Sequence, residues 1–300
     1  MTIRRDMLRA ASRATHLLND STELVINFIN KQFCQDGGFK ARSGQSDLYY
    51  TVFGIEALLA GGVEPPTESI SNYLQRFKDG DSLDLVHLAC LARCWADITQ
   101  SERRDIGTDT RVGIEHHLEE YRSSDGGYNN SKGAEYGTAY GCFLALGAYQ
   151  DLNIEMTNRS ALSGCVKSLR TKDQAYSNEQ GASIGSTPAT AATLTLQHYL
   201  GLSIDDCAAR WLLKQFDTNG GFLVSPAMRE VGVPDLLSTA VALHALTLIA
   251  IPVDHIKEKC LDFLDSLWSG EGGFYANWAD RTLDCEYTYY GLLALGHLSE

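Results

Sequence analysis

A short loop of two glycines and an aromatic residue recurs along this chain, and it constrains the fold more than any other sequence feature. The four copies are Asp36-Gly37-Gly38-Phe39, Asp125-Gly126-Gly127-Tyr128, Asn219-Gly220-Gly221-Phe222 and Glu271-Gly272-Gly273-Phe274. Their second glycines are 89, 94 and 52 residues apart (127 − 38, 221 − 127 and 273 − 221). Each larger spacing holds two periods, so a unit of about 45 to 50 residues repeats. Two degenerate loops are expected near 79–81 and 174–176.

Each unit has the same internal order. An amphipathic run, such as residues 254–264, precedes the loop, and a nearly uncharged run, such as 235–246, follows it about ten residues later. An apolar helix must be buried, whereas a helix with one charged face is half exposed. About six such pairs predict an all-α double ring over residues 1–300, with apolar helices inside and an extra helix at about 1–20. The alternative is an open helical solenoid, but neither end unit looks like a polar cap.

Composition excludes several classes of partner. The chain has 300 residues, 44% hydrophobic and 21% charged, with a formal net charge of −13. Nucleic acids and anionic membranes attract clustered Lys and Arg, so neither is an expected partner. No apolar stretch reaches the roughly 18 to 20 residues of a transmembrane helix. The eight cysteines are scattered singly and the first residues lack the apolar core of a signal peptide, which predicts a cytoplasmic protein.

The Gly-Gly-aromatic loop, followed by an acidic residue and an aromatic-rich helix, resembles the repeat of protein prenyltransferase β subunits and of squalene and terpenoid cyclases. The resemblance spans residues 22–298 and implies an α/α toroid. Squalene cyclases carry a second domain for which this chain has no room. The pattern is most similar to the β subunit of the Rab-type geranylgeranyltransferase, through Gly220-Gly221-Phe222, Pro234-Asp235, Gly272-Gly273-Phe274 and Asp284-Cys285-Glu286-Tyr287-Thr288.

The departures from that subunit concern its zinc site. The resemblance implies Asp, Cys and His ligands, and only Asp235 is kept, because Leu237 and Tyr287 stand at the other two positions. Leucine cannot bind zinc and tyrosine rarely does, so no metal site is expected. The alternative is a zinc site rebuilt from Asp235, Cys285 and Glu286. A diphosphate substrate would bring Mg²⁺ with it.

The segment from Asp284 to Thr288 also resembles the Asp-x-Asp-Asp-Thr motif of protonation-initiated terpenoid cyclases. The resemblance places Glu286 at the proton donor's position, with Asp284 beside it and Asp235 as a third catalytic candidate. A carboxylic acid in an apolar cavity can hold its proton at neutral pH. The alternative is a helix N-cap followed by a solvated glutamate. Asp47 and Asp84 are interpreted as N-caps.

Aromatic side chains are concentrated in the predicted inner helices, where they would line an apolar pocket for an isoprenoid chain or its carbocation. Core filling is the alternative for any single ring. By resemblance, Arg229 matches an arginine that binds diphosphate, and Lys40, Arg42 and Lys132 could add charge at the same rim. The substrate-binding candidates are Tyr49, Tyr50, Phe53, Tyr136, Tyr140, Arg229, His244, Tyr287 and Tyr290.

Two classes of function fit these features. The first is an isoprenoid-processing enzyme, by acid-initiated cyclisation or a related carbocation reaction, with zinc-independent prenyl transfer as a variant. The second is a non-catalytic module, related to the β subunit, that binds a lipid or a partner protein.

Overall fold

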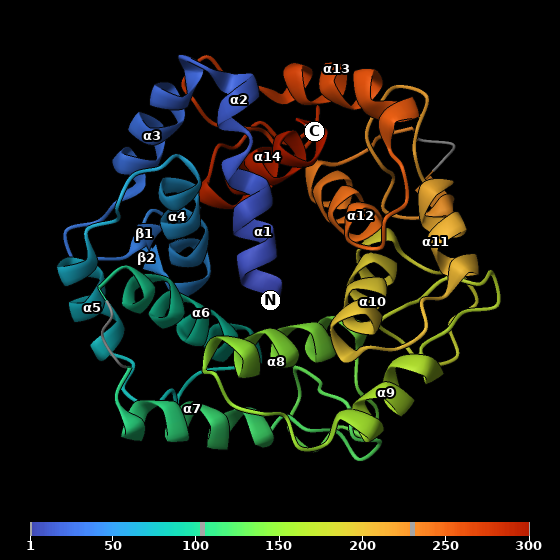
Figure 1. Cartoon of the computed structure of the whole chain (residues 1–300). Coiled ribbons are helices and arrows are strands. Elements are labelled where there is room, and N and C mark those ends of the chain that lie inside the picture. Colours follow the sequence, from blue (N-terminus) through green and yellow to red (C-terminus); the bar gives the residue numbers. More distant parts are fainter. Residues whose placement is uncertain (1, 103–105, 229–231, 300) are drawn as a thin grey trace.

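The computed structural model describes residues 2–102, 106–228 and 232–299, and its helices form two concentric rings (Figure 1). The described chain holds six pairs of one outer and one inner helix. The inner helices are α4 (Leu48–Ala60), α6 (Leu85–Glu102), α8 (Ala139–Asp151), α10 (Thr187–Leu200), α12 (Leu236–Leu248) and α14 (Cys285–Leu298). The outer helices are α3 (Ser21–Gln32), α5 (Thr67–Gln75), α7 (Thr108–Glu119), α9 (Arg159–Ser168), α11 (Asp206–Leu213) and α13 (Lys257–Leu267). The predicted α/α toroid is confirmed.

The inner ring is closed. Each inner helix packs against the next one in the chain, and α14 packs back onto α4. The first glycine of a loop packs closely against an outer helix, and it does so both within the chain and where the last unit meets the first. A Cβ on Gly37 would lie 2.0 Å from the Ser69 carbonyl oxygen of α5, and one on Gly272 would lie 2.1 Å from that of Leu24 in α3. The last loop therefore packs onto the first outer helix, so the solenoid alternative is wrong.

The degenerate loops lie where the repeat predicts them. An isolated bridge joins Arg170 to Tyr176, as equivalent bridges join Phe33 to Phe39 and Trp268 to Phe274. Gln174 takes the position of the first loop glycine and has a φ of 72°. The other degenerate loop contains Gly80, whose φ is 88°. The short strands β1 (Phe39–Lys40) and β2 (Ser46–Asp47) pair antiparallel within the first loop region.

The Asp-x-x-x-Thr segments have a structural role at three inner helices. Asp47 caps α4 by accepting hydrogen bonds from the Tyr49 and Tyr50 amides. Thr51 then accepts a bond from the Phe39 amide, 3.0 Å long, and so fixes the loop aromatic over the helix. Asp235 and Asp284 cap α12 and α14 in the same way, with Thr239 and Thr288 bonded to the loop amides. A carboxylate cap satisfies free amides and meets the positive end of the helix dipole.

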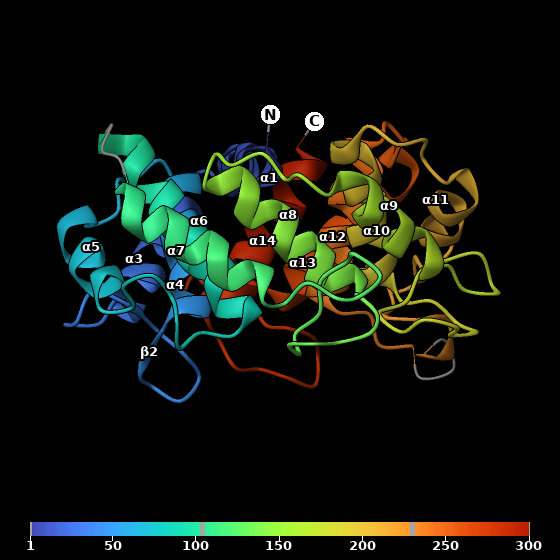
Figure 2. The ribbon, with the colours of Figure 1, turned by 90° about the horizontal axis from the view of Figure 1, so that it is seen from below.

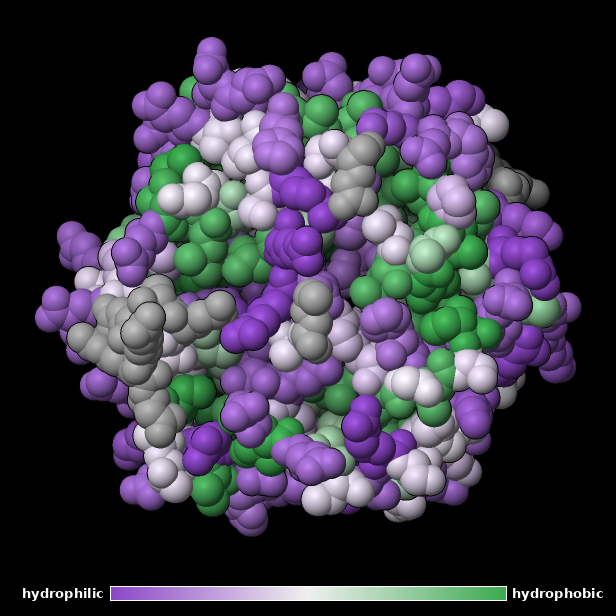
Figure 3. All heavy atoms as spheres, in the orientation of Figure 1, coloured by the Kyte–Doolittle hydropathy of each residue, from purple (hydrophilic) through white to green (hydrophobic). Residues whose placement is uncertain are grey.

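The N-terminal segment does not form one helix over 1–20. It forms α1 (Ile3–Ser12) and the short α2 (Thr15–Leu18), and α1 lies inside the ring (Figure 1). Helix α1 packs against α14, α4 and α8. Figure 2 shows α1 and both termini on one face and the loop around β2 on the opposite face. Hydrophilic side chains cover the centre of the face that carries α1 (Figure 3).

The remaining short elements lie in the outer loops. They are the 3-10 turns η1 (Pro226–Met228) and η2 (Asp254–Ile256). The cysteines are unpaired, and most of them are buried among apolar side chains. A bilayer-spanning helix, long and apolar enough, is not found among the described residues.

Candidate active site

A cavity of about 310 Å³ lies inside the inner ring. All six inner helices contribute side chains to its wall, and α1 contributes Ile3, Arg4 and Met7. Because α1 lies on one face of the ring, it closes that end of the cavity (Figure 2). Small-molecule sites are typically about 300–1,000 Å³, so the cavity has the size of a ligand site.

Aromatic rings form one part of the wall. Tyr49 and Phe53 lie edge to face with centroids 5.0 Å apart, and Phe53 lies 5.5 Å from Tyr290. Tyr140 lines the cavity from α8. The faces of such rings carry negative charge density, so together they favour a cation over a neutral ligand. Tyr49, Phe53, Tyr140 and Tyr290 are therefore placed where the sequence analysis predicts them.

Glu286 lies behind this aromatic wall. It is 8% exposed, and its Oε1 accepts a 2.6 Å hydrogen bond from the Tyr49 hydroxyl. Burial raises the pKa of Glu286 to about 7, while the bond from Tyr49 and the charge of Arg42 oppose the rise. Glu286 does not itself line the cavity; Tyr49 and Tyr290, which its charge influences, do. The arrangement places an acid that is protonated near neutral pH at one end of an aromatic cavity.

Asp284 has a different environment, although it is only 3% exposed. Its Oδ1 accepts the Tyr287 amide and its Oδ2 accepts a 2.7 Å bond from Arg42 Nε. Burial raises the pKa of Asp284, and both bonds favour its ionised form. Asp284 therefore acts as an N-cap and holds Arg42.

Asp47 and Asp84, two other carboxylates that open inner helices, are poor acids. His87 bridges Asp47 and Asp84, with its Nδ1 2.7 Å from Asp84 Oδ1 and its Nε2 3.5 Å from Asp47 Oδ2. Bonds to these carboxylates raise the pKa of His87 to about 9, and the pKa values of both aspartates are lowered. The interpretation of Asp47 and Asp84 as caps is confirmed by their bonds to helix amides. Glu135 is exposed and bonds to Tyr136.

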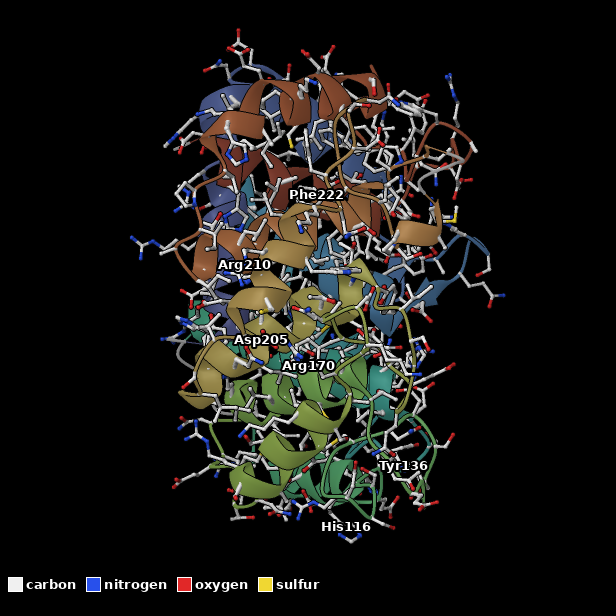
Figure 4. The ribbon with its side chains drawn as sticks, turned by 90° about the vertical axis from the view of Figure 1, so that its right-hand side faces the viewer. His116, Tyr136, Arg170, Asp205, Arg210 and Phe222 are labelled. Carbon is white, nitrogen blue, oxygen red and sulfur yellow. The ribbon has the colours of Figure 1, made fainter. Side chains whose placement is uncertain are left out.

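The residues at the zinc positions of the prenyltransferases do not fit a zinc ion. Asp235 accepts the Ser238 amide through Oδ1, and its buried Oδ2 has no hydrogen-bond partner among the described residues. Leu237 lines the cavity and offers no ligand atom. Asp235, Cys285 and Glu286 do not bring three ligand atoms together. In the described chain, the group with metal-ligand spacing is His116, His117 and Glu120, at the outer edge of the ring (Figure 4).

Several predicted substrate-binding residues lie outside the cavity. Tyr136 is wrong as an inner-helix residue, because α8 begins three residues later, behind the Thr138 cap. It is 42% exposed, bonds to Glu135 and lies at the periphery (Figure 4). Tyr50 packs against Tyr49, and Tyr287 lies under Arg42, with the guanidinium 5.4 Å from the ring centroid. Neither lines the cavity. Arg229 lies outside the described residues.

The family model of the prenyltransferase alpha-alpha toroid domain matches residues 6–196 and 189–299, which is nearly the whole chain. The chain belongs to this family. This toroid is similar in structure to the type II terpene cyclase MstE from Scytonema, with a TM-score of 0.60 and 13% identity over 94% of this chain and 97% of that chain. Two variants of that cyclase in complex with geranylgeranyl dihydroxybenzoate match with TM-scores of 0.59 and 0.62 and 14% and 13% identity. Each covers 95% of this chain and 97% of the other. At this identity the likeness shows the fold alone. No curated protein sequence matches significantly.

The cations proposed for the rim of this toroid are engaged with protein groups. Arg42 bonds to Asp284 and, through its Nη1, to Asp280 at 2.7 Å. Lys132 pairs with Glu120 at 2.5 Å. Lys40 donates to the Lys31 carbonyl oxygen. Arg42 and Lys132 are therefore already paired with carboxylates, which reduces the positive charge that they offer to a diphosphate.

The sequence analysis missed the charged groups at the end of the toroid's cavity that α1 closes. Arg93 forms a double hydrogen bond with the fully buried Glu56, at 2.6 and 2.7 Å. Arg4 pairs with Asp97 at 2.7 Å and with Asp151 at 2.9 Å. Glu56 is the only charged residue of α4, and that was the available signal, since a buried charge requires a partner.

Proposed function

We propose that this toroid catalyses acid-initiated cyclisation of an isoprenoid chain, with Glu286 as the proton donor. The observation that carries the proposal is the pairing of a buried, protonatable carboxyl with an aromatic cavity. Burial of Glu286 raises its pKa to about 7, and the pKa of an effective general acid lies near the working pH. Tyr49 lines the cavity and its hydroxyl bonds to Glu286, so it connects the carboxyl to the cavity wall.

In the proposed reaction, the proton of Glu286 adds to a terminal alkene carbon, and the alkene electrons form the new C–H bond. The other alkene carbon becomes a tertiary cation, and Glu286 becomes a carboxylate. The next alkene attacks this cation, which forms a carbon–carbon bond and moves the charge along the chain. Faces of Tyr49, Phe53 and Tyr290 would each stabilise the cation by about 0.5–2 kcal/mol. Loss of a proton ends the reaction, so the product is an isomer of the substrate.

Protonation of an alkene fits this site better, as the step that generates the carbocation, than loss of a diphosphate group does. Ionisation needs cations or a metal to stabilise the leaving group, and Arg42, Lys40 and Lys132 are all engaged elsewhere. Zinc-independent prenyl transfer is therefore the weaker variant. Among the similar solved structures, the type II terpene cyclase binds a geranylgeranyl substrate, which supports a polyprenyl chain as the substrate class here.

The test uses purified protein with geranylgeranyl dihydroxybenzoate and geranylgeraniol, and product analysis by mass spectrometry and NMR. The expected result is cyclised product of unchanged mass from the wild type. Glu286→Gln is expected to lower substrate consumption at least 100-fold, since general acid catalysis contributes about 10² to 10⁴. Glu135→Gln is the matched control, because Glu135 lies on an exposed loop, and it should leave turnover unchanged.

Two outcomes would overturn the proposal. If Glu286→Gln consumes substrate as fast as the wild type, Glu286 is not the acid. If the wild type binds both lipids but converts neither, the non-catalytic lipid-binding function replaces the cyclase.

A further inference from the structure

Two buried histidines meet where the adjacent inner helices α12 and α14 pack together. His244 of α12 and His297 of α14 are 4% and 6% exposed, and His244 Nδ1 lies 3.1 Å from His297 Nε2. Their outer nitrogens, His244 Nε2 and His297 Nδ1, have no hydrogen-bond partner among the described residues. His244 lines the cavity. Buried polar atoms are normally hydrogen-bonded, so an unpartnered ring nitrogen at a cavity wall indicates that a ligand meets it.

The pair lies at the end of the cavity opposite to Glu286. Glu286 and His297 are eleven residues apart on α14 (297 − 286), which is about 16 Å along a helix that rises about 1.5 Å per residue. His297 follows Gly296, which packs against Ala10 of α1, whereas Glu286 lies at the other end of α14. A chain protonated at Glu286 therefore extends toward His244 as the charge moves along it.

We propose that His244 is the base that removes the last proton, and that His297 is the residue that positions it. This inference rests on the proposed cyclisation, which must end in loss of a proton. In the tautomer that the proposal requires, His244 Nδ1–H donates to His297 Nε2, which leaves the lone pair of His244 Nε2 without a partner among the described residues on a side chain that lines the cavity. Nε2 takes a proton from the carbon next to the cationic centre, and the electrons of that C–H bond form the product alkene. The reaction then leaves Glu286 as a carboxylate and His244 as an imidazolium. Solvent exchange after product release restores both.

The surroundings keep His244 neutral before the reaction. Burial lowers the pKa of His244 to about 4, and the charges of Arg93 on α6 and of His198 on α10 act in the same direction. Burial also lowers the pKa of His297, with contributions from His244 and Arg13. A weak base is sufficient, because the C–H bond next to a carbocation is a far stronger acid than an imidazolium ion.

A structural role for the pair predicts different behaviour from a catalytic one. A pair that only packs α12 against α14 would affect the melting temperature and leave the identity of the product unchanged. A terminating base decides which proton is lost and barely affects the initial protonation at Glu286. The identity of the product therefore separates the two roles.

The test compares wild type, His244→Gln and the control His255→Gln with geranylgeranyl dihydroxybenzoate as the substrate. His255 is exposed in η2. We expect His244→Gln to consume substrate within fivefold of the wild-type rate. Its main wild-type product should fall at least tenfold, replaced by other alkene isomers or by alcohols formed with water. His297→Gln, whose amide oxygen can still accept from His244, should keep the wild-type product, and His297→Leu should lose it. An unchanged product from a folded His244→Gln protein overturns the inference.

A second measurement does not depend on turnover. N,N-dimethylgeranylgeranylamine, protonated at neutral pH, imitates the cationic chain and offers an N–H group. In ¹⁵N-histidine-labelled protein it should shift the His244 Nε2 resonance, identified by its loss in His244→Gln, and bind that variant at least fivefold more weakly. Equal binding and no shift overturn the inference. A shift without conversion of any isoprenoid overturns the cyclase function but retains His244 as a cavity acceptor.

Discussion

The Tyr49 hydroxyl of α4 donates a 2.6 Å hydrogen bond to Oε1 of Glu286 on α14. The bond joins the first inner helix to the last, at the seam where the ring closes. It favours the carboxylate, whereas burial favours the neutral acid, and burial dominates because the pKa of Glu286 is raised to about 7. The seam of the toroid thus holds a carboxyl that is buried and that bonds to a tyrosine hydroxyl rather than to a cation.

The pH dependence of the reaction follows from this balance. The proposed acid works in its protonated form, so the rate of substrate consumption should fall about tenfold per pH unit above pH 7. Tyr49→Phe removes a bond that lowers the pKa of Glu286, so the fall should move to higher pH. Initial rates from pH 5 to 9 test both expectations. Tyr136→Phe, on the exposed loop, is the control. A profile that is flat across pH 7 contradicts the assignment.

Glu286 should also reduce the stability of the fold at alkaline pH. Its pKa rises from 4.5 to about 7 on folding, so between these values the folded state binds the extra proton and the free energy of unfolding falls as pH rises. At about 1.4 kcal/mol per pKa unit, the cost at pH 8 is at most about 3 kcal/mol. Glu286→Gln should therefore be more stable than the wild type at pH 8 and nearly equal to it at pH 4.5. Urea unfolding at both pH values measures the difference, and Glu135→Gln should show none.

Ring closure depends on Gly272. Its φ is 97°, and an added Cβ would meet the Leu24 carbonyl oxygen at 2.1 Å. Gly272→Ala should lower the free energy of unfolding by well over about 1 kcal/mol, since backbone would have to move as well as adopt a strained φ. Gly44→Ala is a matched control, because Gly44 has a φ of 88° with open space around it. Equal losses in the two variants, measured by thermal unfolding, would show that the φ alone matters.

The repeat made the rings predictable, because its signal is local. Glycine loops, caps and the polarity of each helix are all encoded within one unit of about 45 to 50 residues. The position of Glu286 in the first turn of α14 was also predictable, because Asp284 and Thr288 mark the start of that helix, while its role as the acid stays a prediction. The start of α8 was misplaced, because Tyr136 was assigned to the inner helix although that helix begins only after its Thr138 cap.

Contacts that join distant units were not predictable from one sequence. Arg4 lies 93 residues from Asp97 and 147 from Asp151, and nothing in its own helix shows that it turns into the ring. The pairing of His244 with His297, 53 residues apart, is hidden in the same way. Both depend on how neighbouring helices are rotated, which side-chain packing sets and helical periodicity does not.

The ion pairs of Arg4 hold α1 in the ring, so their loss should open the cavity. Arg4→Met leaves Asp97 and Asp151 buried without their cation, and removal of one partner from a buried pair costs about 3–5 kcal/mol. The cost should be smaller at pH 5 than at pH 8, because burial already raises the pKa of both aspartates and protonation relieves the unpaired charge. Arg5→Met, on the exposed face of α1, is the control. Urea unfolding measures the loss, and hydrogen exchange of the α1 amides should rise in Arg4→Met alone. Unchanged protection of α1 would show that apolar packing of Ile3 and Met7 is enough to hold this helix in place.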